Sequence, residues 1–139
     1  MKNLIIVRGL PGSGKSTFAE LIAPHSNVAA DDYFIDDQGR YEFDYKELDA
    51  AHEWCHRQVA VMMELHAPII AVHNTFVRLK YIQPYIDLAE QFDYRYTVLT
   101  AEGEHGSVHN VPPVAIARMI IKWEAFNNPW KDAIKGVLI

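Results

Sequence analysis

The stretch "LIIVRGLPGSGKST", from Leu4 to Thr17, decides the fold of this chain. It begins with four apolar residues in a row, which is typical of a strand buried on both faces of a sheet. The segment from Gly9 to Ser16 then matches the pattern G-x-x-x-x-G-K-[ST]. A buried strand, a glycine-rich loop and a helix start in this order predict a phosphate-binding loop.

Each part of this loop has a physical role. Glycines allow backbone N–H groups to converge on a phosphate, and the helix that begins near Lys15 adds partial positive charge. The ammonium group of Lys15 can reach the β- and γ-phosphates, and the Ser16 hydroxyl can bind Mg²⁺. The sequence therefore predicts ATP and Mg²⁺ as ligands. The predicted nucleotide-binding residues are Gly9, Pro11, Gly12, Ser13, Gly14, Lys15, Ser16 and Thr17.

The rest of the chain alternates apolar runs with amphipathic segments, which favours helices on both faces of a mostly parallel sheet. We expect an α/β fold of the P-loop NTPase type, a three-layer α/β/α sandwich, in a single domain over residues 1–139. A loop over residues 101–112 has no apolar periodicity and is expected to be a mobile lid. The expected strands are 2–7, 27–30, 68–73 and 94–100, and the expected helices are 15–23, 45–66, 78–91 and one from residue 113.

The long second helix carries apolar residues at spacings of three and four, which predicts its buried side. This stripe consists of Leu48, Ala51, Cys55, Val59 and Met62.

The formal net charge of −5 argues against a protein that coats nucleic acid, because such binding needs many clustered Lys and Arg residues. It is compatible with a small ligand or with a nucleic-acid end held by a local patch.

Cys55 is the only cysteine, so no internal disulfide can form and a reducing compartment is expected. The first apolar run stops at Arg8, too early for a signal peptide or a membrane span. A cytoplasmic protein without a membrane partner is therefore expected.

The motifs that are absent narrow the class of enzyme. The N-K-x-D sequence of guanine-specific GTPases does not occur, and the strand "PIIAVH" ends in His73 where a motor ATPase needs an acidic residue. This pattern favours a small-substrate kinase, which requires a carboxylate near the acceptor hydroxyl. Asp31 follows the second expected strand, at the edge where open α/β sheets bind ligands. We therefore expect Asp31 to be catalytic together with Lys15, and Asp32 to be structural or a substrate contact.

The segments "GLPGSGKSTFA", "DDYF", "HNTF" and "VHNVPPVAIARM" resemble the polynucleotide-kinase-like group of P-loop kinases. This group includes the 5′-hydroxyl kinase domain of T-even phages and small phage and bacterial ATP-binding proteins, and the resemblance covers nearly the whole chain. It implies transfer of the γ-phosphate of ATP to a hydroxyl of a nucleic acid or nucleotide, such as a 5′ end or a hydroxymethylpyrimidine in phage DNA. It also implies that Asp31 is the general base and that Asn74 and Thr75 lie in the acceptor groove.

The chain departs from this group at two positions. Phe34 stands where the T-even kinase has a basic acceptor contact, and Gly106 stands where its lid carries an arginine that clamps the transferring phosphate. Residues 101–112 contain no Lys or Arg. Side chains that could replace the missing arginine are His105, His109, Arg118, Lys122, Arg78 and Lys80.

Three functional hypotheses stay open at this point. The chain could be a kinase of nucleic acids or nucleotides, a kinase of a small metabolite, or an ATP-binding module with little turnover.

The C-terminal tail after Asn127 could contribute an oligomer contact. Arg8 is expected to form a surface salt bridge, with a phosphate contact as the alternative. Aromatic side chains near the acceptor side are expected to pack in the core, although they could also wall the acceptor site; they are Tyr41, Phe43, His52 and Trp54.

Overall fold

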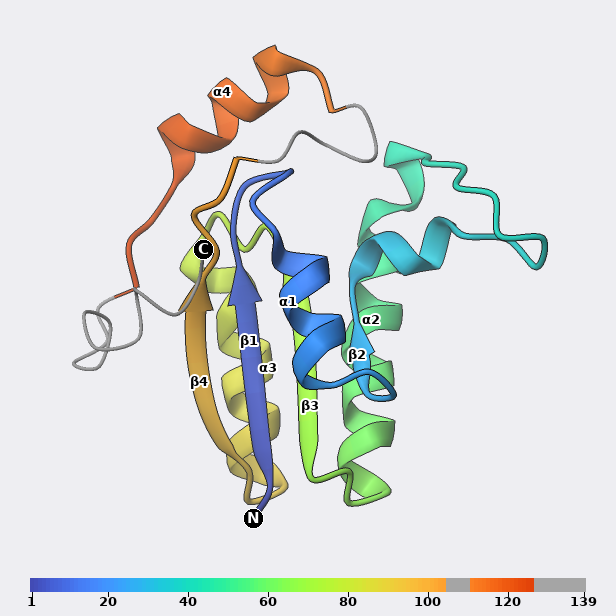
Figure 1. Ribbon diagram of the computed structural model, residues 1–139, viewed down its shortest axis with the longest axis vertical. Coiled ribbons are helices and arrows are strands. Elements are labelled where there is room, and N and C mark those ends of the chain that lie inside the picture. The colour runs from blue at the N-terminus through green and yellow to red at the C-terminus, as the bar shows by residue number, and fades with distance from the viewer. Residues whose placement is uncertain (105–110, 127–139) are drawn as a thin grey trace.

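The computed structural model describes residues 1–104 and 111–126, which form a parallel sheet with helices on both faces (Figure 1). The sheet has four strands in the order β2-β3-β1-β4, and every strand pair is parallel. The predicted α/β fold is therefore confirmed. The strands are β1 (Asn3–Arg8), β2 (Asn27–Val28), β3 (Ile69–Asn74) and β4 (Arg95–Thr100).

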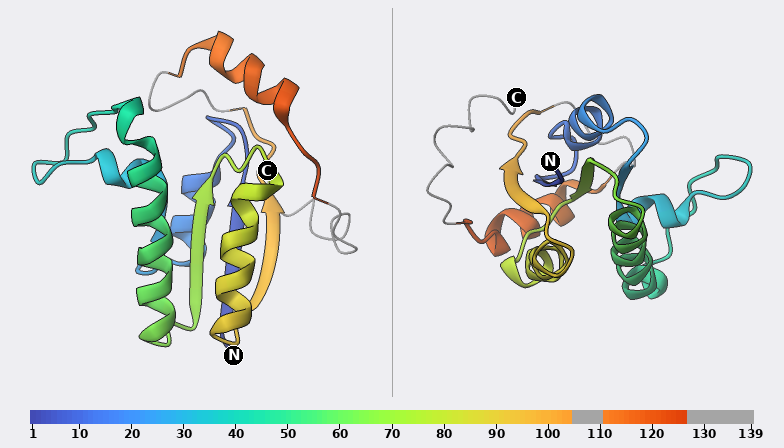
Figure 2. Two further views of the ribbon diagram at one scale, coloured as in Figure 1. Left: turned by 180° about the vertical axis from the view of Figure 1, so that it is seen from behind. Right: turned by 90° about the horizontal axis from the view of Figure 1, so that it is seen from below.

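Helix α1 covers one face of the sheet, and α2 and α3 cover the other (Figures 1 and 2). The α1 face is packed through small side chains, Ala19, Ala23 and Ala71, which allow the helix to approach the sheet closely. Helix α4 lies across the carboxyl ends of the strands (Figure 1). The helices are α1 (Lys15–Ile22), α2 (Leu48–Glu64), α3 (Leu79–Gln91) and α4 (Pro113–Lys122), with 3-10 helices at Ala30–Phe34 and Tyr45–Glu47.

The larger part of the core lies between the sheet and the α2–α3 layer. Ala51, Cys55 and Val59 of the predicted stripe are fully buried in α2, and Met63 takes the place expected for Met62. Leu48 is exposed instead, because the chain is still turning from a 3-10 helix into α2 at this residue.

The second strand is shorter than the sequence predicts, because side chains take the backbone donors that would continue its pairing. The Asp32 carboxylate accepts the N–H of Ala29 at 2.9 Å, and the Asn74 side-chain oxygen accepts the N–H of Ala30 at 2.8 Å. The backbone therefore leaves the sheet and forms the 3-10 helix Ala30–Phe34. Among residues 1–104 and 111–126, no helix is both long and apolar enough to cross a bilayer.

Candidate active site

The loop between β1 and α1 has a shape that only glycine permits at key positions. Gly12 and Gly14 have φ values of 80° and 97°, in the left-handed region. At Gly9 a Cβ atom would stand 2.8 Å from the carbonyl oxygen of Ala101 and would also meet the Ser13 side chain. The N–H of Gly103 donates to the carbonyl of Ser13 at 3.1 Å, so the start of the predicted lid is held against the loop.

The loop gathers donors suited to phosphate at the start of α1. The ammonium Nζ of Lys15 donates to the carbonyl of Leu10 at 3.0 Å, which folds this side chain back over the loop. The Ser13 hydroxyl is buried and has no hydrogen-bond partner within the described part of the chain. Burial lowers the pKa of Lys15 to about 8, and the nearby Asp31 carboxylate offsets part of that shift. A buried hydroxyl, a cation and a helix start together fit the phosphates of a nucleotide.

Asp31 is held at the same edge of the sheet by the 3-10 helix Ala30–Phe34. Its carboxylate accepts a hydrogen bond from the Tyr41 hydroxyl at 3.2 Å. Because the charge of Asp31 acts on the pKa of Lys15, the two residues predicted to be catalytic lie near each other. The backbone beside Asp31 is fixed by Asp32 and Asn74, whose side chains cap Ala29 and Ala30. Asp32 and Asn74, two of the predicted substrate candidates, therefore position the residue predicted to be the base.

In the sequence, His73 is of interest only because it stands where a motor ATPase needs an acidic residue. In the structure, its ring contacts Ser16 and Asn27. His73 Nδ1 lies 3.4 Å from the Ser16 Oγ, and Nε2 lies 3.2 Å from the Asn27 Oδ1. The Asn27 amide nitrogen donates to the carbonyl of Ala23, which fixes its oxygen towards the histidine. That oxygen can only accept, so Nε2 carries the proton and Nδ1 accepts from the Ser16 hydroxyl.

His73 is buried at the end of β3, and this burial lowers its pKa to about 4, with the positive charge of Lys15 acting in the same direction. The imidazole is therefore neutral at physiological pH. Because the neutral His73 accepts the Ser16 hydrogen, the lone pairs of the Ser16 oxygen point away from His73 and are available to a cation.

We expect the protein to lose stability as pH falls from about 6.5 to about 4, because unfolded His73 binds a proton in this interval and folded His73 does not. The full effect is about 3 kcal/mol. Urea unfolding near neutral pH and near pH 4, compared with His73→Asn, measures the share due to this residue. His25→Asn, at an exposed histidine, should retain the full loss. An equal loss in the wild type and His73→Asn would contradict the assignment.

Arg8 is buried, so the prediction of a surface salt bridge is wrong. Its Nη2 donates to the carbonyls of Phe76 and Val77 at 2.6 and 3.3 Å, and its guanidinium lies 3.9 Å from the centre of the Trp123 ring. Burial lowers the pKa of Arg8 to about 10, and Glu124 offsets part of this shift. Arg8 therefore ties β1 to the β3–α3 connection and to the segment after α4.

Replacing Arg8 with Met should lower the free energy of unfolding by about 2–4 kcal/mol, because two carbonyls lose a charged donor and Trp123 loses its cation. Chemical denaturation measures this change. Arg95→Met, at an exposed arginine of β4, is the matched control and should change stability by less than about 0.5 kcal/mol. Similar stabilities of the two variants would show that Arg8 does not hold these segments together.

The remaining predicted site residues lie in different surroundings. Arg78 forms an ion pair with Glu124, 2.7 Å from Nε to Oε1, and the same carboxylate oxygen accepts the N–H of Leu79. Thr75 contributes its carbonyl, which accepts the N–H of Gly9 at 3.3 Å. Arg118 is exposed on α4. His109, half of the predicted lid (residues 105–110) and the predicted oligomer contact of the tail lie outside the described residues.

A family model described as "AAA domain" matches residues 4–105. NEDD4-binding protein 2 of Homo sapiens is 30% identical over 138 residues, covering 88% of this chain and 8% of that protein. The 2',3'-cyclic-nucleotide 3'-phosphodiesterase of Rattus norvegicus is 33% identical over 106 residues, covering 70% of this chain and 23% of that protein. The chain thus spans a small part of both relatives.

Two solved structures show the same fold. Kti12 of Chaetomium thermophilum, in complex with ADP-AlF3, has a TM-score of 0.60 at 16% identity, covering 92% of this chain and 85% of that one. A chain of the Pnkp1/Rnl/Hen1 complex has a TM-score of 0.58 at 16% identity, covering 94% of this chain and 43% of that one. At these identities the likeness concerns the fold.

Proposed function

The chain belongs to the AAA domain family, and from this premise we propose that it is an ATP-dependent kinase that phosphorylates a hydroxyl of a nucleic acid or nucleotide. The observation that supports the proposal is that Asp31 and Lys15 lie at one edge of the sheet, near enough for the Asp31 charge to act on the Lys15 ammonium. A general base for an alcohol and a cation for phosphate are the two groups that such a transfer needs from the protein.

The donor side is formed by the loop and the start of α1. Backbone N–H groups of the loop, the Ser13 hydroxyl and the Lys15 ammonium would bind the phosphates of ATP. Ser16 would hold Mg²⁺, because its hydroxyl oxygen is a hard ligand and its hydrogen is directed to His73. When bound, Mg²⁺ neutralises charge on the β- and γ-phosphates.

On the acceptor side, Asp31 takes the proton of the substrate hydroxyl. The hydroxyl oxygen forms a bond to the γ-phosphorus, and the bond between that phosphorus and the β–γ bridging oxygen breaks, which releases ADP. Lys15 compensates the charge that develops on the phosphates. Tyr41 supports the step by donating to the Asp31 carboxylate, which fixes the direction of its oxygens.

A nucleic-acid or nucleotide acceptor is supported by the "DDYF" and "HNTF" segments and by the rat relative, whose name refers to a cyclic nucleotide. A second candidate is an ATP-binding module with little turnover. It is favoured by two observations on the cations that would be needed to clamp the transferring phosphate. The lid sequence has no Lys or Arg, and Arg78 is paired with Glu124.

A transfer screen with γ-labelled ATP tests the proposal. It offers DNA and RNA 5′-hydroxyl ends, hydroxymethylated DNA, nucleosides and small alcohols. We expect label on a nucleic-acid or nucleotide acceptor. Label on small alcohols alone would overturn the acceptor class, and ATP binding without label on any acceptor would favour the second candidate.

A further inference from the structure

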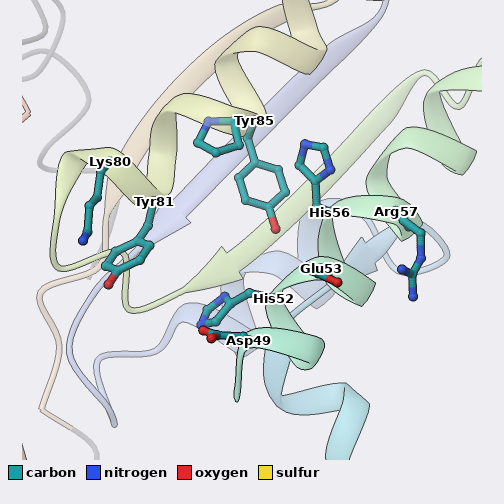
Figure 3. Close-up of a pocket in the computed structure, with 9 residues that line it drawn as sticks. Asp49, His52, Glu53, His56, Arg57, Lys80, Tyr81 and Tyr85 are labelled. Carbon is teal, nitrogen blue, oxygen red and sulfur yellow. The ribbon is translucent and has the colours of Figure 1, made fainter. Parts of the chain in front are cut away.

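A groove of about 420 Å³ lies between α2 and α3, on the face of the sheet opposite α1 (Figure 3). This α2–α3 groove is separate from the phosphate loop. Its volume falls within the range of roughly 300–1,000 Å³ that is usual for small-molecule sites. Its wall is rich in rings: His52 and His56 from α2, and Tyr81 and Tyr85 from α3.

The rings are arranged in pairs that cross the groove. His52 and Tyr81 are stacked, with centroids 6.1 Å apart and planes inclined by 15°. His56 meets Tyr85 edge to face, at 5.5 Å and 62°. Tyr81 is 46% exposed, and the Lys80 ammonium lies 5.1 Å from the centre of its ring, so the exposed part of the ring lies beside a cation. Flat rings offered in this way are the means by which proteins bind unpaired bases.

Charged groups of both signs border these rings. Asp49 and Glu53 supply carboxylates that can accept hydrogen bonds from amino or hydroxyl groups. Lys80 and Arg57 supply cations that can bind a phosphate, and Figure 3 shows them on opposite sides of the ring cluster. A nucleotide unit presents all three partners, namely a flat base, hydrogen-bond donors and a phosphate.

The groove lies beside the predicted base. The 3-10 helix that carries Asp31 packs on α2, with the rings of Tyr33 and Trp54 6.0 Å apart. Burial lowers the pKa of His52, and the negative charges of Asp49 and, to a smaller extent, Asp31 oppose this shift. His52, which lines the groove, is therefore close enough to Asp31 for that carboxylate to act on it.

We propose that the α2–α3 groove binds the terminal nucleotide of the acceptor, with its base stacked on the Tyr81–His52 pair and its sugar hydroxyl directed to Asp31. The inference rests on the proposed kinase function and names its substrate more closely. A base inside a duplex cannot stack on protein rings, so the acceptor is a single-stranded end or a free nucleotide.

The test measures binding of a 5′-hydroxyl dinucleotide with a 3′-fluorescein label, by fluorescence anisotropy. Tyr81→Leu should weaken this binding by roughly 5- to 150-fold, the usual loss for a base–aromatic stack. The matched control is Tyr96→Leu, because Tyr96 of β4 is 40% exposed, similar to Tyr81, and lies outside the groove. Tyr96→Leu should bind the dinucleotide like the wild type. Both variants should bind ATP normally, which also shows that they fold.

Transfer assays separate the two proposals. In the wild type, a single-stranded 5′-hydroxyl end should have a lower KM than a blunt duplex end, and Tyr81→Leu should raise the KM for the single strand. If Tyr81→Leu keeps the dinucleotide affinity, the KM and the transfer activity of the wild type, the proposed role of the groove is wrong and the proposed kinase function stands. If dinucleotide binding depends on Tyr81 but no acceptor receives phosphate, the groove is a nucleotide site and the proposed kinase function is wrong.

Discussion

Replacing Asp31 with Asn is expected to slow phosphate transfer by roughly 10²–10⁴-fold, the usual contribution of a general base. Asparagine keeps the size of the side chain and can still accept from the Tyr41 hydroxyl, but its amide does not take up a proton under these conditions. ATP affinity should stay at the wild-type level or rise slightly, because a negative charge near the phosphates is removed. Single-turnover transfer and equilibrium ATP binding measure the two effects separately.

Asp37→Asn is the control for this variant, because Asp37 is exposed in the turn after the 3-10 helix. It removes the same charge from the surface and should leave transfer unchanged. If Asp31→Asn transfers phosphate at the wild-type rate, Asp31 is not the general base. A loss of both ATP binding and transfer would mean that Asp31 shapes the nucleotide site instead.

Lys15→Met is expected to weaken ATP binding by roughly 10- to 150-fold, which corresponds to the loss of a charged hydrogen-bond donor. It should also slow transfer by roughly 10²–10³-fold, since the ammonium stabilises charge in the transition state. Lys46→Met, at an exposed lysine outside the loop, should change neither quantity. ATP affinity in Lys15→Met equal to that of the wild type would contradict the role of the loop.

The pH dependence of ATP binding gives a second check on the same side chain. The free protein loses the Lys15 proton near pH 8, so wild-type affinity should fall as pH rises through about 8. An ordinary lysine would titrate far above this range. Calorimetric titrations of the wild type should show this fall, and Lys15→Met should not.

The sequence predicted the loop and its flanking elements closely because the signal there is local. The helix was predicted to begin at Lys15, and α1 begins at Lys15. Other features depend on contacts between distant residues, which a local pattern does not contain. The 3-10 helix that carries Asp31 requires Asn74 on a neighbouring strand. The burial of Arg8 requires the carbonyls after β3 and the ring of Trp123.

The aromatic groove was missed for a related reason. His52 and Trp54 were expected to pack in the core, and Trp54 does pack against it. His52 instead faces Tyr81 of α3, and this pairing depends on how two helices lie side by side on the sheet. The sequence does contain the signal in part, as histidines at positions 52 and 56 and tyrosines at 81 and 85, each one helical turn apart.

The place of β1 in the sheet has a consequence for synthesis on the ribosome. Asn3 of β1 pairs with Ile69 of β3 and with Arg95 of β4, so this strand is translated long before either partner. Until then its apolar residues have no sheet to join, and a nascent chain in that state is prone to aggregation. The nucleotide loop cannot take its final shape before translation has passed Ala101 and Gly103, which contact it. Nucleotide binding therefore has to wait until the chain has been translated well past the loop, as far as Gly103.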